Sequence, residues 1–556
     1  MEEIRSTICE TIKRVFEIAD DFDIELTPAP ELEGNGSDFR ADLATNVAMR
    51  LAGKLHKNPR EVAETLRTEL LNAFSDKMPV RIEIAGPGFM NFMLPDEYFK
   101  EVLAKFTTGF DKNISCDEYS GKEVVTEFSD PNPFKVLHIG HLYTSIMGES
   151  ISRLIEYAGG KVHRVNFGGD VGLHVAKTLY SLNFSKEFTI EDIAQAYVEG
   201  TRAYEEDEEA KNKIVALNKQ IYEIAEKDLH DSDLANAYWK GRELSYKYFD
   251  DFYDRIGVKF ERYYPESTVA RKGLMTVREH IPVVYQESDG AIVFRGEDYG
   301  LHTRVFINKE GLPTYETKDV GLLFTKNDDY HFDESVVITG NDIVDYMKVV
   351  LRSIEQYAPE LVEKTQHITH GNVRLPGNEK MSSRKGNFIK AVDILNEVEQ
   401  RVNSNSMLAL GAIKYSLLRY RIGGDIIFDI DESVSMTGNS GLYLQYSAVR
   451  ANKILSNLAG AEHEMNINWK LNAYEIKICK KLVQYGDVLR DAVRGKAPHI
   501  VCNYLFELAQ EFSRFYEECK VAGDEFEQER KKIVQSFANV MTHGLNILGI
   551  DVPESM

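Results

Sequence analysis

The order of apolar and polar positions predicts a strand, a helix and a second strand early in the chain. Residues 123–128 (Glu-Val-Val-Thr-Glu-Phe) are β-branched and aromatic, and the proline-rich turn 130–133 follows them, as is typical of a buried parallel strand. Apolar residues then recur at helical spacing from Leu142 to Ala158, and residues 161–167 form the next candidate strand. Such units place nucleotides at the carboxyl ends of their strands.

The same patterns divide the chain into three domains. Residues 1–110 begin with an amphipathic helix and finish with strand-like segments, which indicates a small α/β domain. Residues 111–430 hold the strand–helix–strand unit and are interrupted by a charged helical insertion at about 190–285. Residues 431–556 consist of long apolar-periodic helices. We therefore expect a multidomain α/β protein, in which a Rossmann-type parallel-sheet domain lies between a small α/β N-terminal domain and an all-α C-terminal helical bundle.

Composition narrows the picture only slightly. The 556 residues carry a formal net charge of -23, which argues against nonspecific nucleic-acid binding over the whole surface and leaves room for local basic patches. The five cysteines lack the paired spacing of a zinc site, and most are expected to be reduced core residues. Neither a signal-type segment nor a membrane-spanning run is apparent, so we expect a cytoplasmic protein with no membrane partner.

The tetrapeptide 138–141 (His-Ile-Gly-His) opens the predicted helix after the first strand. Free N–H groups and the positive end of the helix dipole favour a bound polyphosphate there. Gly140 lets an adenosine lie close to the backbone, while His138 and His141 can donate hydrogen bonds to the oxygens of a reacting phosphate. The alternative is that the two histidines merely cap the helix.

A second motif, Lys-Met-Ser-Ser-Arg, occupies residues 380–384. It lies in a stretch that is rich in glycine, serine and lysine and lacks helical or strand periodicity, which predicts a loop. Its basic and hydroxyl groups could close over the β- and γ-phosphates and stabilise departing pyrophosphate. A solvated basic turn is the alternative. Together the two motifs indicate ATP and chemistry at its α-phosphate.

The two motifs in this order resemble those of a class I aminoacyl-tRNA synthetase, and the finer resemblance is to the arginyl-tRNA synthetases. Residues 127–142 are similar to that family's Glu-Phe-Ser-Ser-Pro-Asn block running into its histidine motif. Residues 313–321 resemble its Tyr-x-Thr-x-Asp block, and residues 443–451 resemble the start of its helical anticodon-binding domain. The resemblance extends over essentially the whole chain.

This resemblance implies ATP-dependent ligation of L-arginine to its cognate tRNA through an arginyl-adenylate, with release of AMP and pyrophosphate. The catalytic residues would be His138, His141, Lys135 and Lys380. ATP would also contact Gly140, Met381, Ser382, Ser383 and Arg384. Arginine would be bound by Glu127, Asn132, Tyr315 and Asp319. The tRNA would contact Asn91, Phe92, Tyr446, Arg450 and Met556.

Some positions depart from the family pattern or keep a second interpretation. Ser383 stands where class I enzymes commonly carry a second lysine, and we hypothesise that Lys135, just before the histidine motif, supplies the missing charge. The third wall of the arginine pocket is expected at Asp342 or Asp345. Two of the named aromatic residues have structural alternatives, a core position for Phe92 and a sheet-surface position for Tyr315.

The expected cofactor is ATP with Mg²⁺, without a metal-ligand cluster in the protein, and the expected partners are tRNA(Arg), L-arginine and ATP. The resemblance implies a monomer that activates arginine only when tRNA is bound. Two other functions stay open. One is a neighbouring enzyme, either a class I synthetase for another amino acid or a small-molecule nucleotidyltransferase. The other is a non-enzymatic RNA-binding protein derived from a synthetase.

Overall fold

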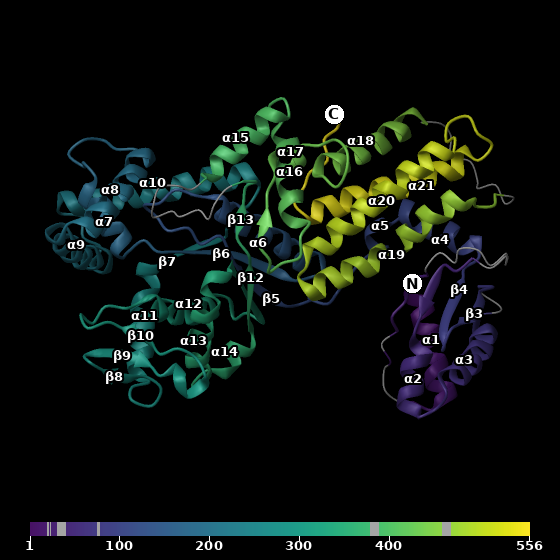
Figure 1. Ribbon diagram of the computed structural model, residues 1–556, viewed down its shortest axis with the longest axis horizontal. Helices are drawn as coiled ribbons and strands as arrows, with labels where there is room; N and C mark the ends of the chain where they lie inside the picture. Colours follow the sequence, from purple (N-terminus) through teal and green to yellow (C-terminus); the bar gives the residue numbers. More distant parts are fainter. Residues whose placement is uncertain (19–21, 23, 30–39, 75–77, 378–388, 459–468) are drawn as a thin grey trace. The chain divides into compact units, whose positions relative to one another are not determined.

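The computed structural model describes the chain except for residues 19–21, 23, 30–39, 75–77, 378–388 and 459–468 (Figure 1). The chain forms two compact units. Unit 1 comprises residues 1–115, 447–490 and 504–544, and unit 2 comprises residues 116–446, 491–503 and 545–556. Each unit therefore combines segments that are far apart in the sequence.

Unit 2 is built on a five-stranded parallel sheet with strand order β12-β11-β5-β6-β7. The strands are β5 (Glu123–Glu127), β6 (Lys161–Gly168), β7 (Arg262–Pro265), β11 (Glu334–Gly340) and β12 (Thr365–His370). Helix α6 (Ile139–Tyr157) connects β5 to β6, which confirms the predicted strand–helix–strand unit. Gly148 allows α6 to approach the sheet, because a Cβ there would lie 2.1 Å from Cγ of Phe128.

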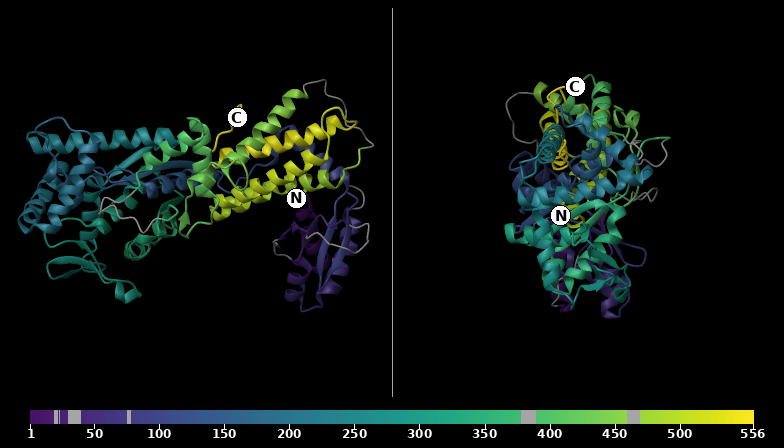
Figure 2. Two further views of the ribbon diagram at one scale, coloured as in Figure 1. Left: turned by 45° about the horizontal axis from the view of Figure 1, so that its top comes forward. Right: turned by 90° about the vertical axis from the view of Figure 1, so that its left-hand side faces the viewer.

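Four helices, and not a short loop, connect β6 to the next strand of the sheet, β7. They are α7 (Leu173–Ser181), α8 (Ile190–Glu206), α9 (Glu208–Lys227) and α10 (Asp233–Ile256), and they share a buried apolar core. Figures 1 and 2 show them gathered at one end of unit 2. The sequence predicted a helical insertion up to about residue 285. The run of helices instead ends at Ile256, because the next element, β7, is a strand of the parallel sheet. This four-residue strand is too short to give a clear periodic signal.

The rest of unit 2 covers the sheet and supplies a second, antiparallel sheet with order β10-β9-β8. Its elements up to β12 are α11 (Glu266–Glu279), β8 (Gln286–Ser288), β9 (Ala291–Phe294), η1 (Gly296–Tyr299), β10 (Arg304–Ile307), α12 (Tyr315–Tyr330), η2 (Asn341–Ile343), α13 (Val344–Glu355) and α14 (Pro359–Glu363). Those after β12 are β13 (Val373–Arg374), α15 (Ala391–Arg401), α16 (Ser406–Leu418), β14 (Ile426–Ile427) and α17 (Ile430–Ser433). Buried side chains of α11, α12 and α13 form one core with β5 and β11.

Unit 1 contains an antiparallel sheet with order β1-β2-β4-β3. Its N-terminal elements are α1 (Glu2–Phe16), β1 (Thr27–Pro28), β2 (Leu43–Thr45), α2 (Val47–Leu55), α3 (Pro59–Phe74), β3 (Arg81–Ala85), β4 (Phe89–Met93), α4 (Asp96–Thr107) and α5 (Phe110–Asn113). The long helices of the C-terminal part, each of which has residues in both units, are α18 (Gly441–Asn457), α19 (Ala473–Gly495), α20 (Pro498–Glu518) and α21 (Glu527–Ile547). The α/β and all-α composition of the two terminal parts agrees with the predicted fold class.

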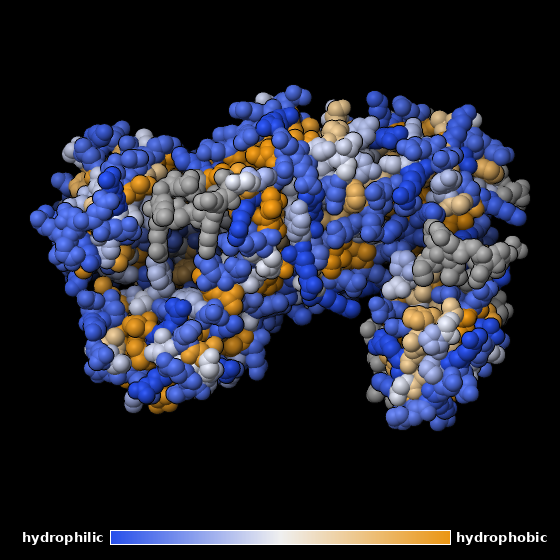
Figure 3. Space-filling model, in the orientation of Figure 1, coloured by the Kyte–Doolittle hydropathy of each residue, from blue (hydrophilic) through white to orange (hydrophobic). Residues whose placement is uncertain are grey.

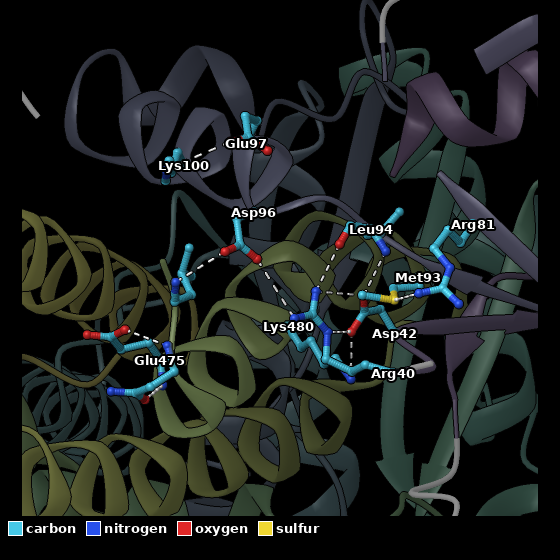
Figure 4. Close-up of polar contacts among 12 residues, drawn as sticks. Arg40, Asp42, Arg81, Met93, Leu94, Asp96, Glu97, Lys100, Glu475 and Lys480 are labelled. Atoms are coloured by element: carbon cyan, nitrogen blue, oxygen red, sulfur yellow. Dashed lines mark hydrogen bonds and ion pairs between the residues drawn. The ribbon is translucent and has the colours of Figure 1, made fainter. Parts of the chain in front are cut away.

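A buried carboxylate joins the N-terminal sheet to α19 within unit 1 (Figure 4). Asp42 is only 1 % exposed, and its side chain accepts hydrogen bonds from Arg40 Nε at 2.8 Å and from the Leu94 N–H at 2.7 Å. Lys480 of α19 pairs with the same carboxylate at 2.8 Å. Two cations and one amide thus satisfy a buried anion, as burial of a charge requires.

The surface shown in Figure 3 is mostly hydrophilic, with scattered hydrophobic patches. In the part of the chain that the structure describes, none of the helices has the length and apolar character needed to cross a membrane. The five cysteines form no disulfide, and Cys479, Cys502 and Cys519 are buried, in agreement with the expected reduced core residues.

Candidate active site

A cavity of about 420 Å³ lies in unit 2 where β5 runs into α6. Its floor comes from the turn and the first residues of α6, including Asn132, Lys135, His138 and His141. Helix α8 supplies a second wall, and Lys390 a third. The residues from α8 are Glu191, Ala194, Gln195, Tyr197 and Val198. The sequence motif at the start of α6 therefore opens onto a space that the helical insertion encloses.

The two histidines form a capping box at the start of α6. The Gly140 N–H donates to His138 Nδ1 and the His138 N–H donates to His141 Nδ1, each at 3.1 Å. Because each Nδ1 accepts a hydrogen bond, each ring carries its proton on Nε2. The helix-capping alternative is thus correct as a description of Nδ1, while Nε2 remains a donor.

Burial keeps both imidazoles neutral. It lowers the pKa of His138 to about 4, with the Lys135 charge as a further cause. Burial, followed by the neighbouring His138 and Lys135, lowers the pKa of His141 well below its usual value. The rings lie 3.9 Å apart, centroid to centroid. At neutral pH the motif therefore presents hydrogen-bond donors without positive charge.

Gly140 has a local reason to be glycine that the sequence did not indicate. A Cβ at this position would lie 2.8 Å from Cε1 and 2.9 Å from Nδ1 of the His138 ring. These contacts are shorter than a side chain tolerates, so the His138 ring could not stay where it caps the helix. The glycine thus protects the capping geometry in addition to any space that it leaves for a nucleotide.

Lys135 supplies positive charge to the same cavity. Its ammonium group lies 5.0 Å from the centroid of the Tyr197 ring on α8, within the range of a cation–π contact. The Lys-Met-Ser-Ser-Arg motif lies outside the described residues, and with it the predicted positions Lys380, Met381, Ser382, Ser383 and Arg384. Tyr197 was not among the predicted site residues, because its position on a charged helix gave no motif.

Asn132 braces the turn against the neighbouring strand end. Its Oδ1 accepts a hydrogen bond from the Gly169 N–H at 2.8 Å. The next residue, Asp170, is fully buried and accepts hydrogen bonds from the Ser267 N–H at 2.9 Å and from Arg242 Nε at 2.9 Å. The Gly-Asp pair therefore fixes the carboxyl end of β6 beside the cavity floor.

Two predicted arginine-binding carboxylates, Glu127 and Asp319, come together in unit 2. Glu127 and Asp319 line one small space of about 20 Å³ together with Lys326. Glu127 is 3 % exposed and forms a buried ion pair with Lys326 on α12. This partner was not predicted, although Lys326 follows Asp319 by seven residues and so lies on the same face of the helix.

Asp319 has a different environment. The Tyr346 hydroxyl donates to its carboxylate, and no ion pair reaches it within the described part of the chain. Burial, with Glu127, Glu266 and Glu316 adding negative charge, raises the pKa of Asp319 to about 8, while the Tyr346 hydrogen bond opposes the shift. Asp319 is thus an acidic group that lacks a cation.

The remaining predicted arginine-site residues are less enclosed. Tyr315 begins α12 and is 56 % exposed, and its ring centroid lies 5.1 Å from the Lys318 ammonium group. Asp342 and Asp345 are both exposed, and Asp345 pairs with Lys348 at 3.1 Å. Tyr346, which contacts Asp319, was not predicted, and the role of Asp342 or Asp345 as the third wall stays a prediction.

The predicted tRNA contacts are distributed over both units. Asn91 and Phe92 are 6 % and 0 % exposed, and Phe92 pairs with Leu43 inside the N-terminal sheet, which supports its core alternative. The Arg450 guanidinium lies 4.3 Å from the Tyr516 ring centroid. Tyr446 and Met556 are both at least 40 % exposed.

A parallel sheet with a histidine motif at the start of its first crossover helix is the layout of a class I aminoacyl-tRNA synthetase. Comparison with known families agrees. Residues 110–409 match the family described as "tRNA synthetases class I (R), catalytic domain". Residues 2–94 match the "Arginyl tRNA synthetase N terminal domain" and residues 444–556 the "DALR anticodon binding domain".

The chain belongs to the arginine–tRNA ligase family, whose members are class I synthetases that attach arginine to tRNA. Arginine–tRNA ligase of Treponema denticola is 26 % identical, with all of both chains covered. That of Clostridium perfringens is 28 % identical over 96 % of each chain. The structure of Thermus thermophilus arginyl-tRNA synthetase has the same fold, with a TM-score of 0.79, 22 % identity and full coverage of both chains. The predicted family, fold class and ligase activity are confirmed.

Proposed function

We propose that this chain activates L-arginine with Mg²⁺-ATP in the cavity beside the histidine motif and then transfers it to tRNA(Arg). The observation that carries this proposal is the orientation of His138 and His141, whose Nδ1 atoms accept backbone hydrogen bonds, so that each ring proton is on Nε2. Neutral donors at a helix start, with the ammonium group of Lys135 in the same cavity, suit an α-phosphate that gains negative charge during reaction.

In the first step an oxygen of the arginine carboxylate attacks the α-phosphorus in line with the departing group. A phosphorus–oxygen bond forms to the carboxylate, the bond to the bridging oxygen breaks, and pyrophosphate leaves with the electron pair. The carboxylate is already ionised, so this step needs no protein general base. His138 and His141 would donate to oxygens of the α-phosphate, and Lys135 would offset charge on the triphosphate. Mg²⁺ would arrive on the ATP phosphates as part of the substrate.

In the second step the terminal ribose hydroxyl of the tRNA attacks the arginyl carbonyl, an ester bond forms, the bond from the carbonyl carbon to the phosphate oxygen breaks, and AMP leaves with the hydroxyl proton on its phosphate. We propose that arginine activation itself requires bound tRNA. We also propose that the enzyme is a cytoplasmic monomer. Asn91, Tyr446, Arg450 and Met556 remain the candidate tRNA contacts, with Phe92 supporting Asn91 from the core.

For arginine recognition we propose that Asp319 is the main anionic partner of the guanidinium. Glu127 has its charge matched by Lys326, whereas Asp319 accepts from the neutral Tyr346 hydroxyl and forms no ion pair with any residue that the structure describes. A planar cation with five donors would supply the missing counter-charge. Glu127 would bound the same pocket, Tyr315 would pack against the substrate, and Asn132 would hold its α-amino or carboxylate end.

One assay tests the proposed function. Pyrophosphate exchange is measured with each of the twenty amino acids, with and without total tRNA. We expect exchange with arginine alone and only in the presence of tRNA. Exchange with another amino acid would identify a different synthetase, exchange without tRNA would contradict the tRNA requirement, and no exchange at all would favour a non-enzymatic RNA-binding protein.

A further inference from the structure

Lys390 lies directly opposite His138 across an isolated antiparallel bridge. Two backbone hydrogen bonds flank the pair, from the Ile139 N–H to the Ile389 carbonyl at 3.2 Å and from the Ala391 N–H to the Leu137 carbonyl at 3.0 Å. This pattern makes His138 and Lys390 a non-hydrogen-bonded pair, in which the Cα atoms are about 4.5 Å apart and the side chains share one face. The start of α15 is therefore tied to the histidine motif itself.

The Lys390 side chain borders the same cavity as His138, His141 and Lys135. It approaches from the start of α15, whereas Lys135 belongs to the turn before α6 and is held against Tyr197 of α8. The two histidines are neutral at physiological pH, so among the described lining residues the cationic side chains are Lys135 and Lys390, and the acidic one is Glu191. The cavity therefore has two ammonium groups on separate elements.

We propose that Lys390 is a second polyphosphate-binding catalytic residue, which acts with Lys135 on the β- and γ-phosphates of ATP. This inference rests on the proposed function. As the bond between the α-phosphorus and the bridging oxygen breaks, negative charge accumulates on pyrophosphate, and an ammonium group that hydrogen-bonds these oxygens stabilises the departing group. No proton is transferred. The backbone hydrogen bonds between the two neighbours of Lys390 and the two neighbours of His138 would hold this ammonium group close to the donors at the α-phosphate.

The test compares Lys390→Met, Lys390→Arg and Lys309→Met in the full-length enzyme. Lys390 and Lys309 are both exposed, so these substitutions should preserve folding, and Lys309 lies in a turn that does not line the cavity. We measure KM for ATP, arginine and tRNA in tRNA-dependent exchange, and the dissociation constant of inorganic pyrophosphate by calorimetry. Lys390→Met should raise KM for ATP and the pyrophosphate dissociation constant about tenfold, the size of one charge-assisted hydrogen bond.

The Lys390→Arg variant should retain most of the affinity for both ligands, and Lys309→Met should behave as wild type. Unchanged KM for ATP and unchanged pyrophosphate binding in Lys390→Met would overturn the inference. A rise confined to KM for tRNA would also overturn it, because the lysine would then contact the nucleic-acid backbone. If wild type shows no arginine-dependent exchange, the proposed function fails, while pyrophosphate binding still tests Lys390 separately.

Discussion

Lys326 on α12 forms a buried ion pair with Glu127 at the end of β5, and its ammonium group also donates to the Ser335 hydroxyl at 3.1 Å. The pair lines the same small space as Asp319. Removal of one partner from a buried pair leaves an uncompensated charge, which costs far more than the loss of a surface pair.

Lys326→Met should therefore destabilise the protein by about 3–5 kcal/mol. The double variant Glu127→Gln with Lys326→Met should recover more than half of this loss, because no charge is left buried. Urea unfolding of the two variants measures the difference. Lys348→Met, which removes an exposed pair with Asp345, is the matched control and should change stability by less than about 1 kcal/mol. Equal losses in Lys326→Met and the control would contradict the buried pairing.

We expect the titration of Asp319 to make arginine binding depend on pH, because we propose this carboxylate as the partner of the guanidinium. Burial, with added negative charge from Glu127 and other carboxylates, raises its pKa to about 8, so the empty pocket holds a neutral acid below that pH. Bound guanidinium favours the ionised form, and binding then releases a proton. KM for arginine should therefore fall up to about tenfold per pH unit between 6.5 and 8 and then level off. Asp319→Asn should have a high KM without this slope, and a wild-type KM that is flat over the same range would be evidence against the mechanism.

His138→Asn separates the two tasks of the imidazole. Asparagine is a good N-cap and can still accept from a backbone N–H, but it cannot place a donor where Nε2 lies. The variant should keep stability within about 0.5 kcal/mol and lose about 10²–10³ in kcat, as for removal of one preorganised donor. His138→Ala should lose the activity and, in addition, about 1 kcal/mol of stability through the missing cap. Should His138→Asn retain normal kcat, the histidine would only be a cap.

Asp42 should be essential to the packing of the N-terminal sheet on α19. Asp42→Ala leaves Arg40, Lys480 and the Leu94 N–H without their shared acceptor, and we expect a loss of about 3–5 kcal/mol. Lys480→Met should cost less, because Arg40 still pairs with the carboxylate at 2.8 Å. Thermal unfolding of both variants checks this order. The reverse order would mean that the ammonium group, not the carboxylate, is central to the cluster.

The parts of the site that follow from sequence are those built from neighbouring residues. The strand, the turn and the helix around 123–157 have a local pattern, and the histidine motif lies within it. Lys326 is 199 residues away from Glu127, and Lys390 meets His138 only because the start of α15 folds back onto the α6 motif. No periodicity in a single sequence encodes such pairings. The four-residue strand β7 was not predicted for a different reason. Its pairing in the sheet, and not its composition, makes it a strand.

Each imidazole of the histidine motif accepts a backbone hydrogen bond at Nδ1 at the start of α6 and carries its proton on Nε2. Lysine and arginine offer a donor but no acceptor for the backbone, whereas serine and aspartate offer an acceptor but do not extend far enough. A screen for folded protein should therefore accept other capping residues, such as asparagine at position 138, whereas a screen for activity should retain histidine. The set of residues accepted at positions 138 and 141 should therefore be smaller than the set that helix capping alone, or hydrogen-bond donation to the substrate alone, would accept.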